Sequence, residues 1–101
     1  MILYNITMQV SWGIHDAWIK WLKEEQLPAL LASGCFTKAQ FVKLIEVNEE
    51  DAATYAVQLY SDDTHLFNKF REDYLEEFQK KETILWGEQV FSFASVMEVI
   101  N

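Results

Sequence analysis

Apolar and polar residues alternate along the first ten positions of the chain. The even positions are apolar, while the polar residues stand between them at Asn5, Thr7 and Gln9. A period of two that includes β-branched and aromatic residues predicts a strand with one strongly apolar face. That face comprises Ile2, Tyr4, Ile6, Met8 and Val10.

The period changes between residues 14 and 36. Apolar residues now recur at spacings of three and four, which predicts an amphipathic helix with Ile14, Ala17, Trp18, Trp21 and Leu22 on its buried side. Pro28 has no backbone N–H and disfavours helical geometry before it, so we expect the helix to bend or restart there. Gly34 is well placed to end it.

The second half of the chain repeats this order of elements. Residues 35–47 and 52–60 are rich in β-branched and aromatic side chains, and a polar turn at 48–51 separates them, so they predict a hairpin. Asp62 and Asp63 suit the start of a helix that runs from about residue 64 to 86 and ends at Gly87. Residues 89–100 predict a last strand.

The predicted order is therefore β-α-β-β-α-β in a single domain spanning residues 1–101. Because both β-α-β crossovers are right-handed, the two helices cover the same face of one antiparallel four-stranded sheet. This is an α+β fold, a ferredoxin-like two-layer sandwich of the dimeric α/β-barrel type.

The last predicted strand is apolar in both of its phases. Phe91, Phe93, Met97 and Val99 alternate with residues that are equally apolar, namely Val90, Ala94, Val96 and Ile100. Two helices cover only one face of the sheet, and soluble monomers seldom expose a large apolar face. We therefore expect a homodimer in which two sheets pack together about a two-fold axis.

Composition narrows the choice of partners. The net charge of −8 and the scarcity of Lys and Arg argue against binding nucleic acid or an anionic membrane surface. No apolar run is long enough to span a membrane, and the N-terminus lacks the features of a signal peptide. The lone cysteine, Cys35, suits a reducing compartment, so we expect a cytoplasmic protein.

The sequence contains no clear catalytic or metal-binding constellation. His15 and Asp16 are neighbours in a predicted helix, where adjacent side chains diverge, so we expect a solvated histidine and no dyad. His65 lacks the further ligands that zinc requires, and Cys35 follows a helix C-terminus, where a buried thiol is expected. We predict no catalytic residue, no metal and no cofactor.

Aromatic residues are the unusual feature of the composition. Most of them fall at core spacing and are expected to fill the core, but they can also line a pocket for an apolar ligand between the helices and the sheet. The candidate pocket residues are Tyr4, Asn5, Trp18, Trp21, Gln26 and Tyr55.

Several tracts carry a resemblance to a known family. With YNITMQV, IHDAWIKWLKEEQLP, ASGCFTKAQFVKLIE, TYAVQLY and FSFASVMEVI, the chain resembles a small bacterial family of unknown function in the dimeric α/β-barrel superfamily. The resemblance implies a ferredoxin-like protomer that pairs through its sheet, and no catalytic residue. In that family the position of Gln26 is often histidine, in a His-x-Pro context with Pro28. A glutamine there cannot shuttle protons, which weakens an enzymatic interpretation.

Two hypotheses follow. The first is a homodimeric, non-catalytic or small-ligand-binding protein that pairs through its open sheet face. The alternative is a small enzyme resembling the cofactor-independent monooxygenases or isomerases of the superfamily. It would act on an aromatic or apolar molecule, with Tyr4, Asn5, His15 or Gln26 as polar anchors.

Overall fold

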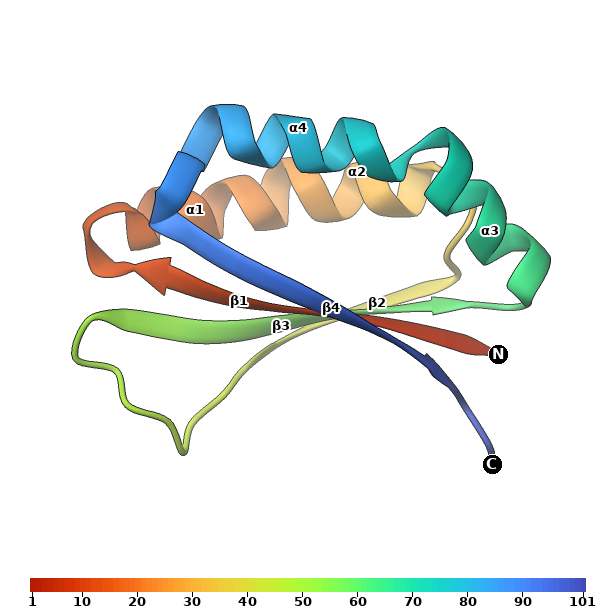
Figure 1. The fold of residues 1–101 in the computed structure, drawn as a ribbon, viewed down its shortest axis with the longest axis horizontal. Coiled ribbons are helices and arrows are strands. Elements are labelled where there is room, and N and C mark those ends of the chain that lie inside the picture. Colours follow the sequence, from red (N-terminus) through yellow and green to blue (C-terminus); the bar gives the residue numbers. More distant parts are fainter.

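A four-stranded antiparallel sheet carries all the helices on one face (Figure 1). The computed structural model describes residues 1–101. Its strands are β1 (Ile2–Ser11), β2 (Lys38–Lys43), β3 (Ala52–Ser61) and β4 (Val90–Glu98), in the spatial order β2-β3-β1-β4. The α-helices are α1 (His15–Trp21), α2 (Leu27–Ala32), α3 (Thr64–Asp73) and α4 (Leu75–Trp86). The predicted ferredoxin-like fold is confirmed.

The first helical arm runs through Pro28 without a break. Between α1 and α2 lies a π-helical turn, η2 (Leu22–Gln26), in which the Leu27 N–H bonds to the Leu22 carbonyl five residues back. Pro28 stands in the first turn of α2, where a missing N–H costs little. Gly34 ends the arm at a φ of 79°, a backbone conformation that favours glycine.

Two predicted elements differ from the structure. The strand expected over residues 35–47 is confined to β2, because the main-chain pairing with β3 extends only one bond further at each end. These bonds run from the Thr37 N–H to the Tyr60 carbonyl and from the Leu44 N–H to the Thr54 carbonyl. The helix expected over residues 64–86 is divided at Tyr74, where φ is −126° and the chain changes direction between α3 and α4 (Figure 1). The predicted cap is confirmed, since the Asp63 side chain accepts a bond from the Leu66 N–H.

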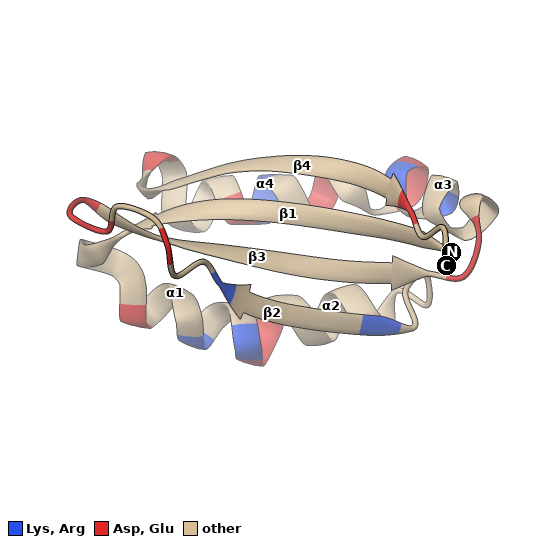
Figure 2. Cartoon of the chain, turned by 90° about the horizontal axis from the view of Figure 1, so that it is seen from below, with Lys and Arg blue, Asp and Glu red and all other residues tan.

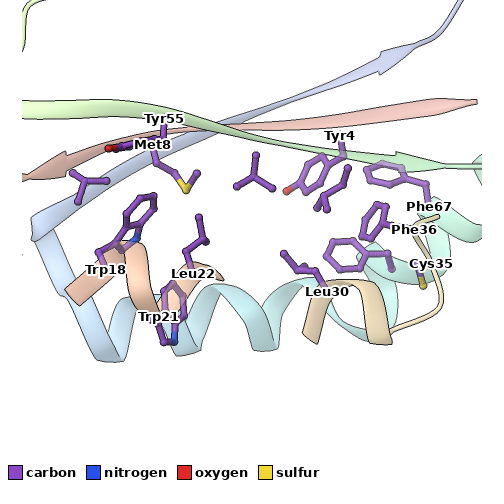
Figure 3. Packing of buried hydrophobic residues seen from close by; sticks show 14 of the residues in the cluster. Tyr4, Met8, Trp18, Trp21, Leu22, Leu30, Cys35, Phe36, Tyr55 and Phe67 are labelled. Atoms are coloured by element: carbon purple, nitrogen blue, oxygen red, sulfur yellow. The ribbon is translucent and has the colours of Figure 1, made fainter. Parts of the chain in front are cut away.

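The core lies between the sheet and the helices. Figure 3 shows its aromatic side chains reaching inward from both layers. Trp18, Phe67 and Phe70 are almost fully buried, and Cys35 is 1% exposed, as predicted for a structural thiol. The even positions of β1 provide much of the floor of this core, as their alternation predicts.

The opposite face of the sheet carries no helix. β1 and β3 contain no charged residue, and Figure 2 shows both of these central strands in tan along their length. The face is not uniformly apolar, because Asn5 bonds to Thr7 and Gln58 at its middle. Its apolar part lies on β4, where Phe91 is 63% and Phe93 is 55% exposed.

Candidate functional site

A cavity of about 120 Å³ opens between α2, α4 and the sheet. It reaches from η2 on one side to β4 on the other, so both helical arms and two strands contribute to its wall. Most of the wall is apolar, and the polar residues are few. The lining residues are Tyr4, Ile6, Gln26, Leu30, Phe70, Leu75, Phe78, Gln79, Glu82, Ser92, Phe93 and Ala94.

Gln26 and Tyr4 are the most deeply buried residues with polar groups in this wall, and Gln26 is the one that stands on a helix. It is 6% exposed, and its Oε1 has no hydrogen-bond partner. The periodicity of the helical arm explains its location. Trp18, Leu22 and Leu30 are buried, and they belong to a series with a spacing of four residues that also includes position 26. A spacing of four drifts around an ordinary α-helix, and the wider turn of η2 reduces that drift. A polar side chain therefore stands within an otherwise apolar stripe.

Glu82 interrupts the corresponding stripe on α4. The half-buried, inward-facing residues of this helix are Leu75, Phe78, Glu82 and Trp86. Burial raises the pKa of the Glu82 carboxyl above its ordinary value, because an apolar environment disfavours the charged form. A carboxylic acid in this position is more readily protonated than one on the surface.

Tyr4 reaches the cavity from the floor. Figure 3 shows its ring extending from β1 into the space between the sheet and the helices. Burial is the main cause that raises the pKa of its phenol; the positive charge of Arg71 opposes this shift, and the negative charge of Glu82 adds to it. The phenol is therefore neutral at physiological pH and can donate a hydrogen bond to a bound molecule.

The polar groups of the cavity share one property: none is paired within the protein. No hydrogen bond or ion pair to another protein group involves the side chain of Tyr4, Gln26, Gln79, Glu82 or Ser92. Gln79 and Ser92 are exposed, whereas Gln26 and Tyr4 are buried, so the cavity has a polar mouth and a polar base. A neighbouring hollow between α4 and β4 shares Gln79, Glu82 and Ser92 and continues the mouth outward.

Only two of the six candidate pocket residues from the sequence meet at this cavity, namely Tyr4 and Gln26. Trp18, Trp21 and Tyr55 belong to the hydrophobic core and do not line the cavity. Asn5 faces away from the helices, because it lies in the opposite phase of β1 from Tyr4 and bonds to Gln58 on the open face.

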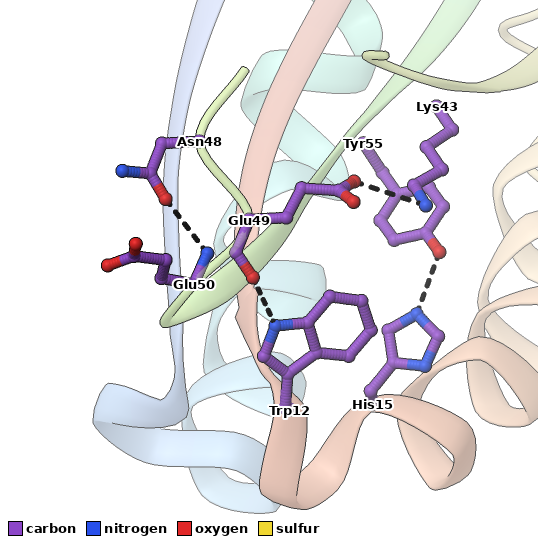
Figure 4. A network of polar contacts seen from close by, with 7 residues as sticks. All are labelled: Trp12, His15, Lys43, Asn48, Glu49, Glu50 and Tyr55. Atoms are coloured by element: carbon purple, nitrogen blue, oxygen red, sulfur yellow. Dashed lines mark hydrogen bonds and ion pairs between the residues drawn. The ribbon is translucent and has the colours of Figure 1, made fainter. Parts of the chain in front are cut away.

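His15 forms a second polar cluster at the far end of the first helix (Figure 4). Its Nε2 lies 2.7 Å from the Tyr55 hydroxyl and its Nδ1 lies 2.9 Å from Asp16 Oδ1, with only 17% of the side chain exposed. The predicted solvated histidine without a carboxylate partner was therefore wrong. The divergence of adjacent side chains holds within a helix, whereas His15 is the first residue of α1. Neither His15 nor Tyr55 lines the cavity.

The loop over residues 44–51 bonds to residues beside this cluster. The Trp12 indole donates to the Glu49 carbonyl at 2.7 Å, and Lys43 pairs with the Glu49 carboxylate at 3.1 Å (Figure 4). The first of these bonds joins the loop to the segment before α1, and the second joins it to the end of β2. Within the loop, the Glu50 N–H bonds to Asn48 Oδ1. These contacts give the cluster a structural role.

The sequence prediction did not include Gln79, Glu82 or Ser92. The usable signal was Glu82, which occupies an inward position in the stripe of α4, and Ser92, which falls in the helix-facing phase of β4 opposite Met8. No group of three His, Cys, Asp or Glu side chains is arranged to hold a metal ion. No helix combines the length and the apolar character needed to cross a membrane.

The comparisons with known proteins agree with this fold. The model of a family described as Domain of unknown function (DUF4286) matches residues 1–100. A search of curated proteins finds no match. Two dimeric ferredoxin-like proteins from an uncultured marine organism are similar structures. One is 12% identical, with a TM-score of 0.75 over 99% of this chain and 95% of the other. The second is 16% identical, with a TM-score of 0.71 over 100% and 96%.

A third similar structure is an ethyl tert-butyl ether D family protein from Bacillus halodurans. It is 13% identical, with a TM-score of 0.68 over 99% of this chain and all of that one. Identities this low establish a common fold and do not transfer an activity.

Proposed function

This chain belongs to the DUF4286 family of domains of unknown function, and we propose that it is a homodimer that binds a small organic molecule in the helix–sheet cavity. The lone buried Cys35 supports a reducing, cytoplasmic location for it. The two halves of the proposal concern opposite faces of one sheet, so each can be tested separately.

One observation carries the ligand-binding half. Polar side chains from η2, α4, β1 and β4 stand at inward positions and meet at one cavity without partners of their own. A buried polar group without a hydrogen bond costs roughly 1–3 kcal/mol. A fold selected for stability alone would have an apolar residue at position 26. A bound molecule that bonds to Gln26 removes this cost in the occupied state.

The homodimer is supported by the open sheet face. It lacks charge over its two central strands, although the protein as a whole carries a net charge of −8, and β4 exposes Phe91, Phe93 and Met97. Two of the similar structures are described as dimeric. A second copy placed sheet to sheet covers these rings and leaves the helix-side cavity free.

Native mass spectrometry of freshly purified protein tests both halves together, since it reports the subunit count and any retained small molecule. We expect a dimer. Ligand-observed NMR with neutral single-ring compounds such as benzyl alcohol then tests the cavity, comparing wild type with Gln26→Leu. The exposed Gln89 provides a matched control, Gln89→Leu. Binding that is equal in all three proteins would contradict the proposed site, and a monomer at micromolar concentration would contradict the proposed dimer.

A second candidate function is an enzyme of the isomerase or monooxygenase type. The observation in its favour is Glu82, because a carboxyl whose pKa is raised by an apolar cavity is suited to general acid–base chemistry. Conversion of a bound compound by wild type, but not by Glu82→Gln, would support this function. Binding without conversion in both proteins would support the ligand-binding function alone.

A further inference from the structure

The charge of the cavity is set by a single side chain. Among the lining residues Glu82 alone is an acid, and the wall contains no Lys, Arg or His. The nearest cations lie outside: Arg71 covers the Phe67 ring at 4.7 Å and Lys81 covers the Phe78 ring at 5.7 Å, and neither lines the cavity. Glu82 forms no ion pair with either of them. An anionic ligand would therefore meet only a carboxylate, with no cation to receive it.

Aromatic rings line the same cavity as this carboxyl. Tyr4, Phe70 and Phe78 contribute to its wall, and the centroid of Phe70 lies 6.0 Å from that of Tyr4 and 6.0 Å from that of Phe78. The faces of aromatic rings carry negative potential and attract cations, which is the principle of the aromatic cages that bind ammonium groups. The net charge of −8 adds a general attraction for cations.

From these contacts we propose that the cavity recognises the ammonium group of a small organic amine, an inference that rests on the proposed ligand-binding function. The ammonium lies against the ring faces and pairs with the Glu82 carboxylate. The side-chain Oε1 of Gln26 accepts a hydrogen bond from the ammonium, and the apolar wall contacts the hydrocarbon part of the ligand. The volume of about 120 Å³ limits the size, because an engineered cavity of ~150 Å³ holds one benzene molecule. A single ring therefore fills this cavity, and the rest of the ligand extends into the neighbouring hollow at the mouth. The ligand class is a single-ring or short-chain primary amine.

The test compares benzylamine with benzyl alcohol, which has nearly the same shape but no charge. Calorimetric titration of wild type is expected to show benzylamine binding at least about tenfold more tightly, as charge-assisted hydrogen bonds exceed neutral ones. Glu82→Gln should remove this preference and leave the affinity for benzyl alcohol within about twofold. Glu77→Gln, an exposed residue of the same helix, is the matched control and should behave as wild type.

Each remaining outcome overturns a defined part of the argument. If benzyl alcohol binds as tightly as benzylamine and Glu82→Gln changes neither, the cavity binds ligands but does not select amines. If Glu77→Gln weakens benzylamine as much as Glu82→Gln does, the attraction comes from net charge and the specific site is refuted. If wild type binds neither compound at millimolar concentration, both the amine site and the proposed ligand-binding function fail.

Discussion

Replacing Gln26 by leucine should make the protein more stable and less able to bind. The Gln26 side chain is 6% exposed, and its Oε1 is buried without a partner. Leucine has a similar size and matches Leu22 and Leu30 on either side of the stripe. Removing an unpaired buried acceptor is worth roughly 1–3 kcal/mol in favour of the folded state. In a domain of this size, 1 kcal/mol corresponds to about 4–8 °C in Tm.

Urea unfolding followed by tryptophan fluorescence measures this change, because Trp18 and Trp21 are buried and report loss of the core. Protein concentration must be held constant, since a dimer is stabilised by mass action. Gln89→Leu, at an exposed position, should change the free energy of unfolding by no more than about 0.5 kcal/mol. Binding of benzyl alcohol or benzylamine by Gln26→Leu should fall by about two- to tenfold, the net value of one hydrogen bond.

A loss of stability in Gln26→Leu would refute the reasoning. It would mean that the glutamine amide is satisfied in the folded protein and contributes to folding, so that its burial gives no reason to expect a ligand. A gain in stability with unchanged binding would refute only the role of Gln26 in recognition. The combination expected here, higher stability with weaker binding, is the trade-off typical of functional sites.

Four further predictions concern other parts of the fold. Because the pKa of Glu82 is raised in the folded state, the folded protein holds a proton that the unfolded chain releases. The stability of wild type relative to Glu82→Gln should therefore fall as the pH rises from the ordinary glutamate pKa toward the raised value. Paired urea titrations of the two proteins across this pH range measure the change. Phe91→Asp should convert the proposed dimer to monomers in sedimentation equilibrium, whereas Ile84→Asp should not, because Ile84 is 83% exposed on the helix side. Trp18→Ala should destabilise the protein by about 3–5 kcal/mol in urea unfolding, because the side chain is fully buried. Gly34→Ala should cost about 1–2 kcal/mol in the same assay, because φ is 79° there.

The fold was predictable because each strand and the first helix show their period directly. The even positions of β1 face the helices, and their partners on β3 and β4 follow from the antiparallel register. The end of β2 and the break between α3 and α4 were not predictable from the local pattern of apolar and polar residues. Apolar residues continue past Lys43, and only the end of pairing with β3 stops the strand there. The break at Tyr74 has no glycine or proline to mark it.

Glu82 was missed although the periodicity places it on the inward side. The apolar stripe through Phe70, Tyr74 and Phe78 reaches position 82 at the next step of four and Trp86 at the one after. The acidic residues of this helix were interpreted together as a solvated face, whereas Glu82 is half-buried. Gln26 was among the candidate pocket residues because the family resemblance implies a histidine at that position.

The strongest reason to regard the cavity as a site is the agreement among independent elements. A single inward polar residue in a small core is ordinary and often joins two segments of the chain, as His15 does where it bonds to Tyr55. Here η2 and α4 each place one polar residue within an otherwise apolar inward stripe, at Gln26 and Glu82, and Ser92 lies in the helix-facing phase of β4. Nothing in local folding requires these residues to meet, because the three are far apart in the chain. They nevertheless line one cavity, and none bonds to another. Under the proposed ligand-binding function, a bound molecule supplies the partners that these groups lack within the chain.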